Sequence, residues 1–137
     1  MAKDKIHEIV KKAIENDGWL ITHDPLIFQI NNDFIAIDLG AEKMIIAERG
    51  NKKIAVEIKT FDQPSLIYEF HKVLGQYYNY ETVLSVTDKQ RELFIAIPDV
   101  IHNILLKNSI IKKSIERIKM KFIIVNLENS KIVEWIK

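Results

Sequence analysis

Two stretches in the first half of the chain decide which fold to expect: Phe34-Ile35-Ala36-Ile37-Asp38-Leu39-Gly40, and Ile54-Ala55-Val56-Glu57-Ile58-Lys59. Both predict strands, because apolar side chains recur at every second position and successive side chains of a strand point to opposite faces. In the first stretch Asp38 falls on the face opposite to Ile37. In the second, Glu57 and Lys59 point the same way. Two carboxylates and an ammonium group therefore stand where apolar side chains are expected.

This arrangement suits metal and phosphate chemistry. Side chains two residues apart on a strand lie roughly 6 to 7 Å from each other, so one metal ion or one phosphate can touch both Glu57 and Lys59. Carboxylates from neighbouring strands favour a hard cation such as Mg2+ or Mn2+, which activates a water and offsets charge on a phosphodiester. Lys59 would orient that water. The plainer interpretations are an ordinary ion pair on an exposed strand and an aspartate facing a turn at Gly40.

Composition limits the classes of protein to which the chain can belong. A length of 137 residues with 47% hydrophobic content predicts one compact domain over 1–137. The formal charge of +1 gives no global basic field, so any binding of nucleic acid must be local. With no cysteine there is no disulfide framework, and the opening Met1-Ala2-Lys3-Asp4-Lys5 does not resemble a signal peptide. We therefore expect a cytoplasmic protein without a membrane span, for which ~20 apolar residues are needed.

The rest of the chain alternates helical and extended patterns. Gly18 predicts the stop of the first helix, and Ser65 predicts the cap of a long one. The element order predicts an α/β (α+β) fold in which a mixed β-sheet is flanked by helices. The expected segments are a helix over 6–14, extended segments over 19–22 and 26–30, a strand over 44–48, a tight hairpin turn at Gly50-Asn51, a helix over 65–86, a strand over 93–97, a helix over 99–106, a loop and further helix within 107–119, and strands over 122–127 and 131–135.

The spacing of the charged residues, with the long helix after them, resembles the PD-(D/E)XK nuclease superfamily. Asp38 matches its first acid, and Glu57-Ile58-Lys59 matches its (D/E)XK element. In the helix, Gln76 and Tyr80 are one turn apart and resemble the Gln-x-x-x-Tyr element of the RecB-like branch. No proline precedes Asp38, which departs from the superfamily pattern. The resemblance implies a restriction-endonuclease-like fold and a single nuclease-like domain.

It also implies residue roles in a Mg2+- or Mn2+-dependent endonuclease. Asp38 and Glu57 would hold the metal, Lys59 would assist the attacking water, and Gln76 would position that water or the substrate. Tyr80 is an auxiliary candidate. From the helical pattern alone, Gln76 is equally a polar edge of the helix and Tyr80 a core residue.

Over its full length the chain resembles the XisH family, the fdxN-element excision controlling factors of cyanobacteria. The resemblance implies a role in programmed DNA rearrangement beside a site-specific recombinase, with DNA and a small XisI-like protein as partners, and it leaves a homo-oligomer open. The alternative is a noncatalytic nuclease-fold regulator that binds DNA or the XisI-like partner. The matching segments are 2–4, His7, 17–19, 22–25, 37–43, 54–59, 74–77 and 132–136.

Two further residues are auxiliary candidates for the site. The superfamily often supplies an acid from the first helix, but Glu8 lies at the centre of the polar face here. His7 lies near the edge of the apolar stripe and is the better candidate, although a structural hydrogen bond also explains it. Glu42 follows the Asp38 strand and is an extra acid or a solvated turn residue.

A basic run near the C-terminal end of the sequence is the candidate nucleic-acid contact. Lys112, Lys113 and Arg117 belong to a segment, 107–121, that holds six basic residues and a single acid, Glu116. Such side chains contact phosphates in nucleic-acid complexes. The same run is typical of a solvated helix face.

Overall fold

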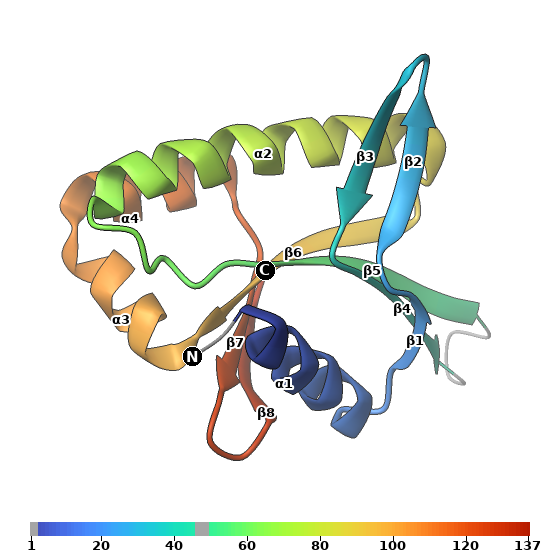
Figure 1. Cartoon of the computed structure of the whole chain (residues 1–137), viewed down its shortest axis with the longest axis horizontal. Coiled ribbons are helices and arrows are strands. Elements are labelled where there is room, and N and C mark those ends of the chain that lie inside the picture. The colour runs from blue at the N-terminus through green and yellow to red at the C-terminus, as the bar shows by residue number, and fades with distance from the viewer. Residues whose placement is uncertain (1–2, 46–49) are drawn as a thin grey trace.

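The computed structural model describes residues 3–45 and 50–137. Strands form a six-stranded sheet in the order β1-β4-β5-β6-β7-β8 and a two-stranded sheet, β2-β3. Figure 1 shows α2 and α1 on opposite sides of the larger sheet, with the β2-β3 hairpin projecting from it. The elements are α1 (Lys3–Asn16), β1 (Leu20–His23), β2 (Leu26–Ile30), β3 (Asp33–Ile37), β4 (Leu39–Ile45), β5 (Gly50–Ile58), α2 (Leu66–Thr87), β6 (Arg91–Pro98), α3 (Asp99–Lys107), α4 (Ser109–Ile118), β7 (Phe122–Asn126) and β8 (Lys131–Ile136).

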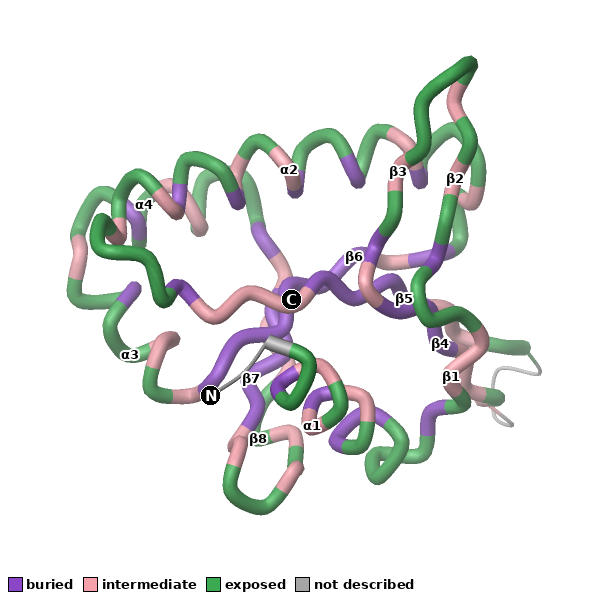
Figure 2. Tube along the Cα trace, in the orientation of Figure 1, coloured by how far each residue is buried: buried purple, intermediate pink, exposed green. Residues whose placement is uncertain are grey.

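The larger sheet is mixed. β5, β6 and β7 are parallel, whereas β1, β4 and β8 pair antiparallel to their neighbours. The parallel strands are central and covered on both faces, as parallel strands usually are, and Figure 2 shows buried residues concentrated there. The predicted mixed sheet flanked by helices is thus confirmed. Among the described helices, none is both long and apolar enough to cross a membrane.

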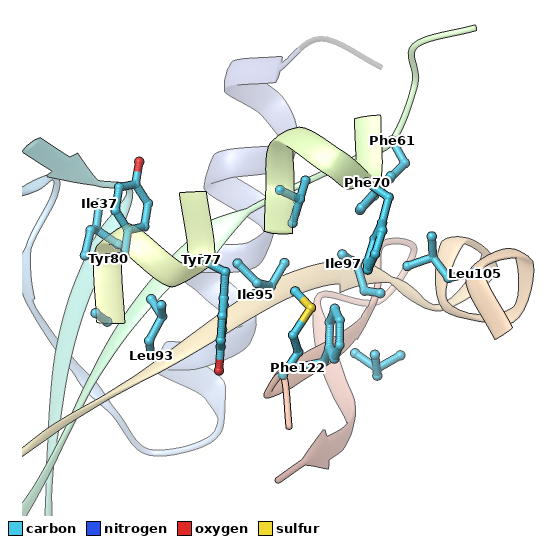
Figure 3. Close-up of a cluster of buried hydrophobic side chains, with 14 of the residues drawn as sticks. Ile37, Phe61, Phe70, Tyr77, Tyr80, Leu93, Ile95, Ile97, Leu105 and Phe122 are labelled. Atoms are coloured by element: carbon cyan, nitrogen blue, oxygen red, sulfur yellow. The ribbon is translucent and has the colours of Figure 1, made fainter. Parts of the chain in front are cut away.

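Each face of the sheet has its own core. On the α2 face, the helix contributes buried side chains spaced three or four positions apart, which is the stripe that an α-helix needs to cover a sheet; Figure 3 shows part of this cluster. These helix residues are Phe70, Val73, Tyr77, Tyr80 and Leu84. On the other face, α1 packs Ile6, Val10, Ala13 and Ile14 against the sheet.

The helix boundaries agree with the sequence signals. Ser65 caps α2 by accepting a hydrogen bond from the Tyr68 backbone, as predicted. Gly18 follows α1 with φ +95°, a conformation that glycine adopts without steric cost. The indistinct segment after 107 resolves into α4, whose start is capped by the Asn108 side chain accepting from Ile110 and Ile111 at 3.1 Å.

One turn prediction is wrong. Gly50 and Asn51 are not a hairpin turn, because both already belong to β5 and pair with Ile45 and Met44 of β4. The buried pair Leu39 and Val56 sets this register, and the ladder continues without a shift to Gly50. The part of the predicted 44–48 strand beyond Ile45 lies outside the described residues.

Candidate active site

Asp38 lies where the chain passes from one sheet to the other. β3 ends at Ile37 in the small sheet, and β4 begins at Leu39 in the large one. Ile37 packs in the α2 core and Leu39 in the α1 core, so the two are buried on opposite sides. The prediction that 34–40 is one strand is therefore wrong, because residues two apart in a strand share a face. The break leaves Asp38 half-buried at a bend.

Hydrogen bonds lock this bend onto β5. Asp38 Oδ2 accepts a bond of 2.8 Å from the Ile58 backbone amide. In return, the Asp38 amide donates to Glu57 Oε1 at 3.2 Å. Two side-chain carboxylates thus replace the backbone acceptors that a continuing ladder would provide. The exchange brings Asp38 and Glu57 side by side.

Glu57 is the buried member of the pair. It lies on the α2 face of β5 together with Ala55, and its relative exposure is 6%. Burial and, to a smaller extent, the adjacent Asp38 charge raise the pKa of Glu57 to about 7, although Lys59 opposes the shift. A carboxyl group that holds its proton near neutral pH is typical of functional sites, although structural ion pairs also shift pKa values.

Lys59 completes the cluster. Its backbone amide donates to Ala96 O at 3.0 Å, which extends the pairing of β5 with β6 by one residue. Its Nζ lies 3.3 Å from Glu57 Oε2. Lys59 also lines a cleft of ≈ 220 Å³, bordered by Ile6 of α1 and Glu69 of α2. The ammonium group therefore lies between the buried carboxylate and open space.

Helix α2 places two polar groups above the carboxylates. Tyr80 is buried, and its hydroxyl donates to Ala36 O at 3.3 Å while accepting from Gln76 Nε2 at 2.8 Å. Figure 3 shows the Tyr80 side chain beside Ile37, with its hydroxyl turned out of the apolar cluster. Burial raises the pKa of Tyr80 to about 12, and the charges of Glu57 and Asp38 contribute. Tyr80 is thus both a core residue and an electrostatic neighbour of the site.

The structure therefore brings Asp38, Glu57, Lys59 and Tyr80 together, with Gln76 reaching the group through Tyr80. The Gln76 amide nitrogen bonds the tyrosine hydroxyl and not a carboxylate. Oxygen donors from Asp38 and Glu57 fit a hard divalent cation, and a buried carboxyl pair of like charge gains from a cation between its members. These two residues are the ones that would hold a metal.

His7 lies in a separate polar cluster. Its Nε2 is 2.7 Å from Asp24 Oδ1, and Lys11 Nζ donates to Asp24 Oδ2 at 2.9 Å. Although burial opposes it, the hydrogen bonds from Lys11 and His7 hold the pKa of Asp24 below its ordinary value. The predicted structural hydrogen bond of His7 is confirmed. The Asp24 carboxylate is bonded to α1 and not to its own turn.

Sequence analysis missed Lys11 and Asp24. The pairing of Leu26 with Ile37 and of His23 with Gly40 puts Asp24 across from the Asp38 bend. The available signal was the separation of His7 and Lys11 by one helical turn, which puts both on the same side of α1. Donor atoms of His7, Glu8 and Asp24 lie within 4.8 Å of one another. However, the Lys11 ammonium group already occupies the cation position beside Asp24.

Glu42 and the basic run lie apart from the Asp38–Glu57 pair. Glu42 is a residue of β4 and not of a turn; its Oε1 is 3.8 Å from Arg91 Nη2 and 3.9 Å from Lys53 Nζ. Lys112, Lys113 and Arg117 are exposed on α4. Figure 1 shows α4 beside the N-terminal end of α2, whereas the β2-β3 hairpin rises at the other end.

Comparison with known proteins places this arrangement in a family. The profile of the family described as "XisH protein" matches residues 1–133. No functionally curated protein matches the chain.

Two solved structures share the whole fold. One is an XisH family protein from Nostoc punctiforme PCC 73102, with 35% identity, a TM-score of 0.87, and coverage of 98% of this chain and 100% of that one. The other is a fdxN element excision controlling factor protein from Anabaena variabilis, with 34% identity, a TM-score of 0.88 and the same coverage of both chains. The chain belongs to the XisH family.

Proposed function

We propose that this protein is a DNA-processing factor with a metal-dependent, endonuclease-like site, and that it controls excision of a DNA element. The observation that carries the proposal is the convergence of Asp38, Glu57 and Lys59 at the end of β5, where each carboxylate accepts a backbone amide of the other's segment. We assign the fold to the restriction-endonuclease-like class on this arrangement. The name of the Anabaena variabilis relative supports a role in excision.

Each residue of the site would have its own role in the reaction. Asp38 and Glu57 would hold Mg2+ or Mn2+, which when bound supplies a Lewis acid and a water of lowered pKa. Lys59, whose ammonium group faces both Glu57 and the cleft, would orient the attacking water and offset charge that develops on the phosphate. Tyr80 fixes the rotamer of Gln76, which would then hold a substrate oxygen.

A second function is supported by the same geometry. Glu57 is already paired with Lys59, and Gln76 is already bonded to Tyr80, so the groups are satisfied without a substrate. A noncatalytic regulator that binds DNA or a XisI-like protein would retain these bonds as structure. The net charge of +1 also favours dependence on a partner for DNA affinity.

Cleavage of DNA distinguishes the two functions. Supercoiled, linear and branched DNA would be incubated with Mg2+ or Mn2+ and with wild type, Glu57→Gln or Lys59→Ala, in the presence and absence of the partner. We expect each variant to cut at least about 100-fold more slowly than wild type, because one transition-state contact is lost.

Glu128→Gln in the turn between β7 and β8 and Lys131→Ala at the exposed start of β8 are the matched controls and should cut like wild type. Circular dichroism verifies that all four variants fold. If wild type cuts no substrate even with the partner, while Glu57→Gln and Lys59→Ala still support excision in cells, the regulator is the correct function.

A further inference from the structure

Helix α1 covers only part of its face of the six-stranded sheet. Its buried side chains lie over Leu39, Ala41 and Val56, and the helix ends at Asn16. Further along, the same face bears Ile54 and Phe94. There the structure has a cleft of ≈ 280 Å³, larger than the one beside Lys59.

The floor of this cleft is aromatic and fixed in place. Trp135 lies with its ring centroid 5.7 Å from that of Trp19 and 5.0 Å from that of Phe94, the latter at 86°. Such edge-to-face contacts add stability beyond buried area. The Trp19 indole nitrogen also donates to Asp17 Oδ2 at 3.2 Å. The floor is therefore formed before any ligand arrives.

The rim of the cleft is cationic. Lys43, Lys52 and Lys137 line it, and Lys43 Nζ lies 5.8 Å from the Trp19 ring centroid while donating to the Asp17 carbonyl. Neither Lys52 nor Lys137 has an ion-pair partner within residues 3–45 and 50–137.

Both carboxylates at the cleft are already engaged. Asp17 accepts from Trp19, and Glu92 accepts from Lys121 Nζ at 3.0 Å. Burial opposes the shift, but Lys121, with the charges of Lys137 and Lys52, holds the pKa of Glu92 below its ordinary value. Among the described residues only Asp17 then remains without a cation partner, and the three lysines of the rim outnumber it, so the net charge of the cleft is positive.

We propose that this cleft docks an acidic peptide segment of a partner protein, which packs one large apolar side chain against the half-buried Trp135 and sets its carboxylates against Lys43 and Lys52. The volume is below the roughly 300 to 1,000 Å³ of small-molecule sites and suits a single anchor side chain. Nucleobases are a poorer match, because stacking needs open ring faces and, of the three aromatic residues of the cleft, Trp19 and Phe94 are buried and Trp135 is half-buried. This surface is separate from the proposed DNA site and does not depend on it.

Tryptophan fluorescence measures the docking directly, since the two tryptophans of the chain both line the cleft. The probe is a short synthetic peptide with a central phenylalanine flanked by glutamates. We expect a saturable change in emission with wild type. Binding should weaken at least about ten-fold when lysines replace the glutamates, when glycine replaces the phenylalanine, or in the Lys52→Glu protein.

Lys12→Glu reverses a charge on the exposed side of α1 and should bind like wild type. Carbodiimide coupling should join the peptide carboxylates to Lys43 or Lys52, which mass spectrometry identifies. The proposal is overturned if no saturable change occurs, if the lysine peptide binds equally well, if Lys52→Glu has no effect, or if a single-stranded oligonucleotide binds the cleft more tightly than the acidic peptide. DNA cleavage by Lys52→Glu reports separately on the proposed function and should match wild type.

Discussion

Among the described residues, Glu57 and Arg91 are the two buried charged side chains, and their surroundings differ sharply. Arg91 Nε lies 2.8 Å from Asp88 Oδ2, and Nη1 donates to Ile54 O at 3.0 Å, with Glu42 also near. Glu57 has one cation, Lys59, and a carboxylate of the same sign, Asp38, beside it. The buried charge of Arg91 in β6 is therefore balanced, whereas that of Glu57 in β5 is not.

The difference indicates that Arg91 has a structural role and that Glu57 has a chemical one. A buried charge that is fully paired contributes to the fold, whereas one that is left with a like charge costs folding energy. A protein retains a buried charge that lowers its stability where that group has a function. A divalent cation bound between Asp38 and Glu57 would remove the repulsion between the two carboxylates. The imbalance at Glu57 is thus the physical reason to assign the site to this end of the sheet.

The largest effect on stability is expected at Arg91. Arg91→Ala should lower the free energy of unfolding by about 3 to 5 kcal/mol, because it leaves Asp88 and the Ile54 carbonyl without their cation and Glu42 with Lys53 alone. Chemical denaturation measures this change. Lys53→Ala is the control, since it also removes a cation near Glu42 but from a half-exposed position, and should cost at most about 1 kcal/mol. Equal losses in the two variants would show that Arg91 is not the balanced buried charge described above.

At high pH, Glu57→Gln should raise the free energy of unfolding relative to wild type, whereas Arg91→Ala lowers it. The folded-state pKa of Glu57 is raised from 4.5 to about 7, so the folded protein binds the proton more tightly than the unfolded chain. Wild-type stability from this group is therefore lost as pH rises from 4.5 to about 7, which corresponds to ~3 kcal/mol at about 1.4 kcal/mol per pKa unit.

Glutamine does not ionise, so Glu57→Gln should become the more stable protein relative to wild type as pH rises through this window. Denaturation of both proteins at several pH values in the absence of divalent ions provides the measurement. A constant difference between them from acid to alkaline pH would show that Glu57 is not strained by its charge.

The sequence predicts those features of the site that depend on local contacts, and it does not predict those that depend on tertiary packing. The alternation in 54–59 correctly places Glu57 and Lys59, because period-2 patterning is a property of the strand itself. The break at Asp38 was not predictable in this way. Ile35, Ile37 and Leu39 continue one pattern without interruption, and only the packing of Ile37 and Leu39 against different helices separates the strands.

Other parts of the site depend on tertiary contacts in the same way. The sequence shows that Gln76 and Tyr80 are one helical turn apart. It does not show that the Tyr80 hydroxyl donates to the Ala36 carbonyl of β3 and accepts from Gln76. Likewise, nothing near Asp24 in sequence indicates that its carboxylate binds α1 rather than its own turn.

The smallest expected effect is at Tyr80. Tyr80→Phe removes hydrogen bonds to Ala36 and Gln76 but keeps the buried ring, so it should cost about 1 kcal/mol in the free energy of unfolding. Tyr78→Phe, whose side chain is exposed on the same helix, should cost nothing measurable. If Tyr80→Phe matched Tyr78→Phe, the tyrosine would not be a fixed support for Gln76.

A carboxyl-carbon NMR titration of Glu57, with and without Mg2+, tests the central claim most directly. The charge imbalance predicts a pKa of about 7 without the ion, because burial and Asp38 both raise it. Adding Mg2+ should then lower the pKa towards or below the ordinary 4.5, since the ion stabilises the ionised carboxylates that bind it. A titration midpoint near 4.5 without Mg2+, or one that Mg2+ leaves unchanged, would contradict a metal site at Asp38 and Glu57.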